Sequence, residues 1–284
     1  MLEKLNELFR KIYSNFRLDY RLITTSNLKF VERINYTFNK YFCILTNKRK
    51  IKYLGKEFAY DNRFAPAILQ DYPREIIEID RAINLKKIRK VLDIGANIGQ
   101  FSFTLSKFFP NIEVYSFEPN KSAFKFLEKN VKELEKVRVY NYGVGKIEGK
   151  RILYYSKSAS SEGSLYKKNM NQNYLRKDIL KTDIEILKPT KDNLRNLGIP
   201  IRIDLVKIDV EGAELEVLES LKEIEFDYLY IEVSVKRKGG TLNEIFDLIR
   251  EKLEKTPKLL YYCLPEKNSP CANAIFLLKN NEQR

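Results

Sequence analysis

A lysine and two acids alternate at the end of an apolar run, where side chains can take part in proton chemistry. In Lys207-Ile208-Asp209-Val210-Glu211, Lys207 and Asp209 fall on one face of a predicted strand. Burying them costs free energy unless they pair with each other or bind a ligand. We predict Asp209 as the main active-site carboxylate, with Glu211 and Lys207 assisting it. The alternative is a structural Lys207–Asp209 pair, with Glu211 capping the next helix.

The chain contains no histidine, which excludes several catalytic devices. A Ser-His-Asp triad, a Cys-His pair and a histidine general base all require that side chain. Proton transfer must then use Asp, Glu, Lys, Tyr or water.

Asp209, Glu211 and Glu232 are hard oxygen donors that could gather a divalent ion, but we assign no metal site. The cysteines are too sparse for a zinc site or a disulfide framework: Cys43, Cys263 and Cys271.

A turn containing two glycines follows an earlier apolar strand, Val91–Ile94. Gly95 and Gly99 would let the backbone approach a ligand closely. A dinucleotide-binding turn would need glycine at Asn97 and Gln100, so this turn suits a cofactor without phosphate. A carboxylate at Asp93 would repel pyrophosphate but suits the cationic methionine part of S-adenosylmethionine. The turn therefore predicts S-adenosylmethionine as the cofactor.

Further cofactor contacts are predicted after the next two strands. Glu118 ends the strand Val114–Phe117, where an acid can accept hydrogen bonds from both ribose hydroxyls. Tyr142 and Gly143 follow the third strand, where adenine usually lies in a fold of this type. The predicted cofactor-binding residues are Asp93, Gly95, Ala96, Asn97, Gly99, Glu118, Pro119, Tyr142 and Gly143.

Strands and helices alternate from about residue 88, which predicts a parallel sheet with helices on both faces. The predicted strands are 91–94, 114–117, 137–142, 204–210 and 228–235, and the predicted helices are 100–108, 122–134, 213–221 and 242–253. Segments 259–264 and 274–278 are expected to form a terminal antiparallel pair. The predicted fold class is thus α/β, with a mostly parallel, doubly wound sheet and a C-terminal antiparallel strand pair.

Two regions fall outside this alternation. Residues 1–85 are predicted as a mainly helical extension of the domain at 86–284. Residues 150–200 are predicted as an insertion over the carboxyl edge of the sheet, with a strand at Ile152–Tyr155 and a serine-rich loop at Ser156–Ser164. Elements that select a substrate usually lie at that edge.

Several of these motifs together resemble the FkbM-type methyltransferase family over about residues 57–235. They are Asp93-Ile94-Gly95-Ala96-Asn97-Ile98-Gly99, Phe117-Glu118-Pro119-Asn120, Asn141-Tyr142-Gly143-Val144-Gly145, Gly163-Ser164-Leu165 and Leu205-Val206-Lys207-Ile208-Asp209-Val210-Glu211-Gly212-Ala213-Glu214. The resemblance implies a Rossmann-like class I methyltransferase fold and methyl transfer, usually to oxygen and often on a sugar. Family members often carry histidine after the acid of Ile231-Glu232-Val233, where this chain has Ser234.

The net charge of +14 indicates an anionic partner, or else a solvated lysine-rich surface. In residues 1–20, apolar side chains recur at helical spacing among basic ones. This segment is expected to pack on the main domain or to lie on an anionic membrane. Lys48-Arg49-Lys50 and Lys52 form a second basic cluster.

No apolar run is long enough for a membrane helix, so we expect a cytoplasmic protein, peripheral to the membrane if the lipid interpretation holds.

Three functions are left open by the sequence. The leading hypothesis is O-methylation of a sugar hydroxyl on a glycan or glycolipid acceptor. The positive charge favours an RNA methyltransferase as the alternative, although Asp209-Val210-Glu211-Gly212 stands where base methyltransferases often carry an Asn/Asp-Pro-Pro-Tyr-type motif. A module that binds cofactor without catalysis is the third, and the intact cofactor turn weighs against it.

Overall fold

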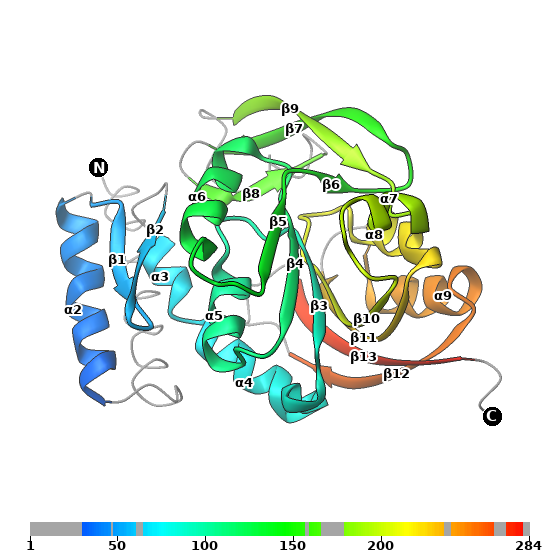
Figure 1. The fold of residues 1–284 in the computed structure, drawn as a ribbon, viewed down its shortest axis with the longest axis horizontal. Coiled ribbons are helices and arrows are strands. Elements are labelled where there is room, and N and C mark those ends of the chain that lie inside the picture. The colour runs from blue at the N-terminus through cyan, green and yellow to red at the C-terminus, as the bar shows by residue number, and fades with distance from the viewer. Residues whose placement is uncertain are drawn as a thin grey trace. The chain divides into compact units, whose positions relative to one another are not determined.

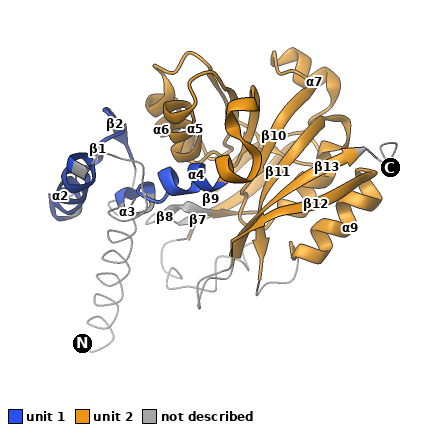
Figure 2. Ribbon diagram, turned by 90° about the horizontal axis from the view of Figure 1, so that it is seen from below, with its two compact units in different colours: residues 1–78 blue, residues 79–284 orange. Residues whose placement is uncertain are grey.

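The structure is a computed structural model, and it describes residues 30–46, 48–60, 65–156, 159–165, 179–235, 240–263 and 271–280. The predicted amphipathic segment at residues 1–20 lies outside these ranges. The chain divides into two compact units, residues 1–78 and 79–284 (Figure 2). In the described part of the chain, no helix is both long and apolar enough to cross a membrane.

The first unit combines helices with a short hairpin. It contains α2 (Phe30–Thr46), β1 (Lys50–Tyr53), β2 (Lys56–Ala59) and α3 (Ala65–Leu69), while α4 (Tyr72–Ile83) begins in this unit and ends in the second. The hairpin was not expected in a mainly helical extension. Its turn residues, Leu54 and Gly55, both have positive φ (47° and 81°), as a tight two-residue turn between antiparallel strands requires.

The second unit is built on a seven-stranded sheet with the order β12-β13-β11-β10-β3-β4-β5 (Figure 1). Its strands are β3 (Lys90–Ile94), β4 (Glu113–Phe117), β5 (Val137–Tyr140), β10 (Arg202–Ile208), β11 (Glu225–Ser234), β12 (Lys255–Tyr262) and β13 (Cys271–Asn280). Strands β5, β4, β3, β10 and β11 run parallel, and β13 pairs antiparallel with β11 and β12. The predicted α/β class and the terminal antiparallel pair are confirmed.

Helices cover both faces of this sheet (Figure 1), and its central strands are therefore buried on both sides. They are α5 (Gln100–Phe108), α6 (Lys121–Val131), α7 (Lys191–Asn196), α8 (Glu214–Ser220) and α9 (Leu242–Lys252). On one face, side chains of alternating strand positions such as Leu92 and Val206 share a buried core with Val217 of α8 and Ile249 of α9. The opposite face of β3 and β10 carries Asp93 and Lys207, and α5 packs there.

The predicted insertion at 150–200 contributes most of a second sheet, and its predicted strand at Ile152–Tyr155 lies within one of the observed strands. Its strands are β6 (Gly143–Val144), β7 (Gly149–Ser156), β8 (Ala159–Ser164) and β9 (Ile179–Leu187), in the order β6-β9-β7-β8. The expectation of a serine-rich loop at 156–164 was therefore wrong at 159–164. Pairing of β7 with both β8 and β9 supplies backbone partners that the local composition did not reveal. Leu153, Ile184 and Ile186 form a small apolar core beneath this sheet.

Candidate active site

A row of polar side chains crosses the centre of the main sheet. Asp93 of β3, Lys207 of β10 and Tyr230 of β11 stand side by side in register. Asp93 and Lys207 are both buried, with 0% and 3% of their surfaces exposed. The Lys207 Nζ lies 3.2 Å from Asp93 Oδ1 and 3.4 Å from Asp209 Oδ2. The predicted Lys207–Asp209 pair is present, and Asp93 is a second partner that the sequence did not indicate.

The second oxygen of Asp93 accepts a hydrogen bond from one serine, which in turn contacts a second serine. Ser102 Oγ of α5 donates to Asp93 Oδ2 at 2.6 Å and lies 2.8 Å from Ser116 Oγ of β4. Sequence reasoning missed both serines, whose only signal was a polar residue at a buried helix or strand position. Because Lys207 and Ser102 already contact its carboxylate, we expect Asp93 to serve a cofactor by holding the turn in place.

The cofactor turn, residues 95–99, is shaped by its neighbours. The amides of Gly95 and Ala96 both donate to the Phe117 carbonyl, at 3.0 and 2.9 Å. Gly95 has φ +83°, and a Cβ there would lie only 1.9 Å from the Asp209 carbonyl oxygen. Glycine at 95 thus allows β3 to approach the end of β10, a reason different from the ligand approach that we expected. At Gly99, with φ +90°, a Cβ would meet Leu127 of α6 at 2.9 Å.

Glu118 clamps the cofactor turn to the loop after β4. Its Oε2 accepts from the Asn97 amide at 2.9 Å, and its Oε1 accepts from the Asn120 amide at 2.7 Å. Burial raises the pKa of Glu118 to about 7, although the two amides partly oppose this shift. Asn97 has φ +51°, and its buried Oδ1 has no hydrogen-bond partner in the described structure. That oxygen and the Glu118 carboxylate are acceptors beside the turn.

The loop after β5 closes the same side of the site. Asn141 Nδ2 donates to the carbonyls of Glu118 and Pro119, at 2.8 and 3.2 Å, and so fixes one loop against the other. Sequence reasoning quoted Asn141 in a motif but gave it no role. Tyr142 packs partly against the main core. A Cβ at Gly143 would lie 2.6 Å from Ile186 Cδ1, so this glycine lets β6 pack closely on β9.

Three carboxylates gather where β10 and β11 end. Asp209, Glu211 and Glu232 each offer an oxygen within 4.8 Å of the others, and all three residues are partly exposed. We call these residues the acidic cluster. The Asp209 amide donates to the Ile94 carbonyl at 3.1 Å, which places the cluster directly beside the cofactor turn. The structure therefore brings together the residues predicted for chemistry and those predicted for the cofactor.

The loop between β10 and α8 has an unusual backbone. Glu211 has φ +55° and Gly212 has φ +104°. The Gly212 amide donates to Glu214 Oε1 at 2.8 Å, just before α8 begins. Sequence reasoning did not single out Glu214. Burial raises the pKa of the Glu214 carboxyl. Ser164 Oγ of β8 donates to the Glu211 carbonyl at 2.8 Å and ties the second sheet to this loop.

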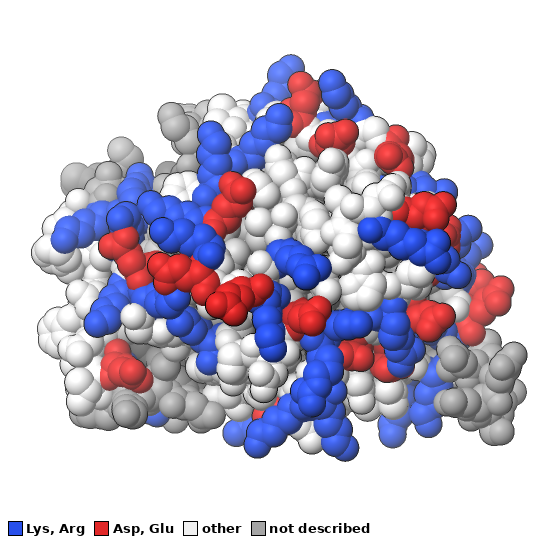
Figure 3. Space-filling view, viewed as in Figure 1, with Lys and Arg blue, Asp and Glu red and all other residues white. Residues whose placement is uncertain are grey.

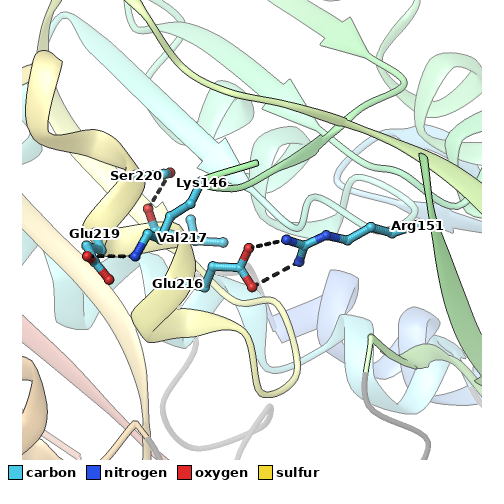
Figure 4. A network of polar contacts seen from close by, with 6 residues as sticks. All are labelled: Lys146, Arg151, Glu216, Val217, Glu219 and Ser220. Carbon is cyan, nitrogen blue, oxygen red and sulfur yellow. Dashed lines mark hydrogen bonds and ion pairs between the residues drawn. The ribbon is translucent and has the colours of Figure 1, made fainter. Parts of the chain in front are cut away.

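Ion pairs connect the second sheet to α8, the helix that follows the loop after β10 (Figure 4). Arg151 of β7 contacts both carboxylate oxygens of Glu216, at 3.0 and 2.8 Å, as a bidentate pair. Lys146 contacts Glu219 one turn further along, at 2.8 Å. The second sheet is therefore anchored beside the acidic cluster, where an acceptor would have to enter.

A mostly parallel sheet in this order, with a glycine turn after β3, an acid after β4 and antiparallel strands at one edge, defines a Rossmann-like class I methyltransferase fold. Residues 93–256 match the model of the methyltransferase FkbM domain. The chain belongs to the FkbM methyltransferase family.

Three individual proteins are among those to which this chain is similar. Methyltransferase sdnD of Sordaria araneosa is 30% identical over 207 residues, which cover 61% of this chain and 80% of that protein. Methyltransferase 1 of Beauveria bassiana is 25% identical over 151 residues, which cover 49% of this chain and 61% of that protein. The structure of M. jannaschii TYW2 in complex with AdoMet aligns with a TM-score of 0.45 at 16% identity, covering 81% of this chain and 85% of that one.

Replacing Lys207 by methionine should lower stability strongly, because Asp93 would keep a buried charge without its cation. We expect a loss of about 3–5 kcal/mol in the free energy of unfolding, measured by denaturant titration at pH 7. Arg202→Met is the matched control, since it removes a cation from the exposed Arg202–Asp227 pair on the same strand. The control should lose less than about 1 kcal/mol. Equal losses in the two variants would contradict the role given to Lys207.

Proposed function

We propose that this chain is an S-adenosylmethionine-dependent O-methyltransferase that acts on a sugar hydroxyl of a glycan or glycolipid acceptor. The observation that carries the proposal is the acidic cluster beside the cofactor turn. Family membership supports methyl transfer, and the arrangement of Asp209, Glu211 and Glu232 supports a hydroxyl-bearing acceptor.

The residues around the cofactor turn fit S-adenosylmethionine by their chemistry. The ribose offers two hydroxyl donors, and Glu118 offers a carboxylate that can accept from both while its amide bonds persist, since each oxygen has more than one lone pair. Asn97 Oδ1 is a buried acceptor with no partner in the described structure, and it suits an amino donor of the cofactor. When bound, S-adenosylmethionine supplies a methyl group that transfers by direct displacement from its sulfonium.

The acidic cluster suits an acceptor with several hydroxyl groups. Three carboxylates within 4.8 Å of one another repel, and hydroxyl donors of a sugar can relieve that repulsion by hydrogen bonding. Asp209 adjoins the cofactor turn, since its amide donates to the carbonyl of Ile94, the residue before the turn. We assign it the removal of the proton from the acceptor hydroxyl, with Glu211 and Glu232 orienting the acceptor. The buried ammonium group of Lys207 contacts the Asp209 carboxylate and holds it in position.

A nucleic-acid acceptor is favoured by one observation, the net charge of +14. The face in Figure 3 carries basic and acidic side chains interspersed, and no single basic tract dominates it. The carboxylates of the acidic cluster would repel phosphates that approach the site. RNA methylation therefore remains the second candidate.

Methyl transfer can be measured directly with purified protein and labelled S-adenosylmethionine. Lipid-linked glycans and RNA, each extracted from cells that lack the gene, serve as acceptors. We expect label in the glycan fraction, at a sugar oxygen located by fragmentation mass spectrometry. Label found in the RNA alone would replace the proposed function by the second candidate.

Substituting Asp209 by asparagine should slow methyl transfer by about 10²–10⁴-fold, because the amide cannot take the hydroxyl proton. Cofactor affinity should change little and the melting temperature only modestly, since Asp93 still pairs with Lys207 and Asp209 is partly exposed. Asp204→Asn provides the same substitution at the opposite end of β10, where Asp204 accepts from the Arg89 and Lys90 amides. Near-normal turnover in Asp209→Asn, with a large drop in melting temperature, would show that the carboxylate is only structural.

Cofactor affinity should fall as the pH is lowered through about 7, the pKa to which burial raises Glu118. The ionised carboxylate accepts ribose hydroxyls, whereas the protonated form has lost acceptor capacity. Below the pKa, each pH unit should raise the dissociation constant by up to about tenfold, as for any group that must ionise to bind. Calorimetry from pH 5.5 to 8.5 tests this, and Glu118→Gln should bind more weakly with a flatter profile. A flat wild-type profile would rule out the ribose contact.

A further inference from the structure

Helix α2 is held in the first unit by one of its faces. Tyr36 OH donates to the Pro66 carbonyl at 2.6 Å, and Lys40 Nζ donates to Gln70 Oε1 at 3.4 Å. Cys43 is buried, and its thiol donates to the Lys50 carbonyl. These residues recur every three to four positions, so they form one side of the helix, packed against the hairpin and α3 (Figure 1).

The opposite face of α2 is apolar as well, yet it is exposed to solvent. Val31, Phe38, Phe42 and Leu45 have exposed fractions of 65, 73, 49 and 84%. A helix on the surface of a soluble domain usually turns a polar face outward. An apolar face that is left exposed, in addition to the packed one, indicates a surface that binds a partner or a membrane. We call these four residues the outer face of α2.

Basic residues adjoin the outer face at the carboxyl end of the helix. Lys48, Arg49, Lys50 and Lys52 are all exposed. The ammonium group of Lys48 lies 4.6 Å from the centre of the Phe42 ring, so the basic cluster and the outer face are in direct contact. Lys50 pairs with Glu57, and basic side chains outnumber acidic ones between residues 30 and 59.

We propose that the outer face of α2 docks on an anionic membrane surface. Its aromatic and aliphatic side chains enter the boundary between headgroups and acyl chains, while the adjacent lysines and arginine contact lipid phosphates. Charge selects this occupant: a second copy of the chain would bring its own basic cluster against the first, whereas an anionic bilayer complements it. The proposal concerns a surface of the first unit and does not depend on the acceptor assigned above.

Vesicle sedimentation with the full chain tests this surface. We expect binding to vesicles of phosphatidylcholine with phosphatidylglycerol, and at least tenfold weaker binding to phosphatidylcholine alone. Binding should weaken steeply between about 50 and 300 mM salt, because the electrostatic part is screened. The double variant Phe38→Asp/Leu45→Asp should bind anionic vesicles at least tenfold more weakly than wild type, since it loses two inserting side chains.

The control for added charge is Thr37→Asp/Asn39→Asp, which places two acids on the flanks of the same helix, about 90° or more around its axis from the centre of the outer face. It should bind clearly better than the Phe38/Leu45 variant, and both should keep the wild-type circular dichroism spectrum. Equal loss in the two variants would overturn the role of the outer face. A dimer in sedimentation velocity that Phe38→Asp/Leu45→Asp dissolves, without vesicle binding, would assign the face to a second copy instead. Binding that is equal for neutral and anionic vesicles would also contradict the proposal.

Discussion

The arrangement of the site depends on one buried ion pair, between Lys207 and Asp93. A lysine that is 3% exposed is costly to ionise unless carboxylates surround it, and here Asp93 and Asp209 lie within 3.4 Å of its ammonium group. Asp93 precedes the cofactor turn and Asp209 begins the acidic cluster. The same cation therefore holds the two halves of the site together, and the Ser102 hydroxyl fixes the remaining carboxylate oxygen of Asp93.

The second sheet borders the buried centre of the site. It follows β5 along the chain. Ser164 donates a hydrogen bond to the loop between β10 and α8, and Arg151 forms an ion pair with α8. Both anchors are polar, and of the two Ser164 is buried while Arg151 is partly exposed. The second sheet is thus attached to the site through side-chain contacts at its edge, whereas the Lys207–Asp93 pair lies in the main sheet.

Much of this site could be predicted from local patterns. The alternation of strands and helices indicated the doubly wound sheet, and the acids after β4 and β10 were found because polar residues ending apolar strands lie at one edge. The partner of Lys207 could not be found in this way. Spacing within one strand pointed to Asp209, whereas Asp93 becomes a neighbour only because β10 lies beside β3, which are far apart in the chain. The glycine at 95 was expected for a ligand, but its close neighbour is the Asp209 backbone for the same topological reason. Strand β8 was missed because its serine-rich sequence is typical of a loop, although it forms a local hairpin with β7, and β9 was missed because its partners in β6 and β7 lie far from it in the chain.

The most direct test of this arrangement is a double-mutant cycle on Lys207→Met and Asp93→Asn, followed through the free energy of unfolding. If the two side chains form one buried pair, each single variant leaves an uncompensated group and the double variant recovers part of the loss. The coupling free energy should then be at least about 2 kcal/mol, within the range for residues in direct contact. A coupling near zero would show that the two side chains act independently, and the site would then lack the central connection described here.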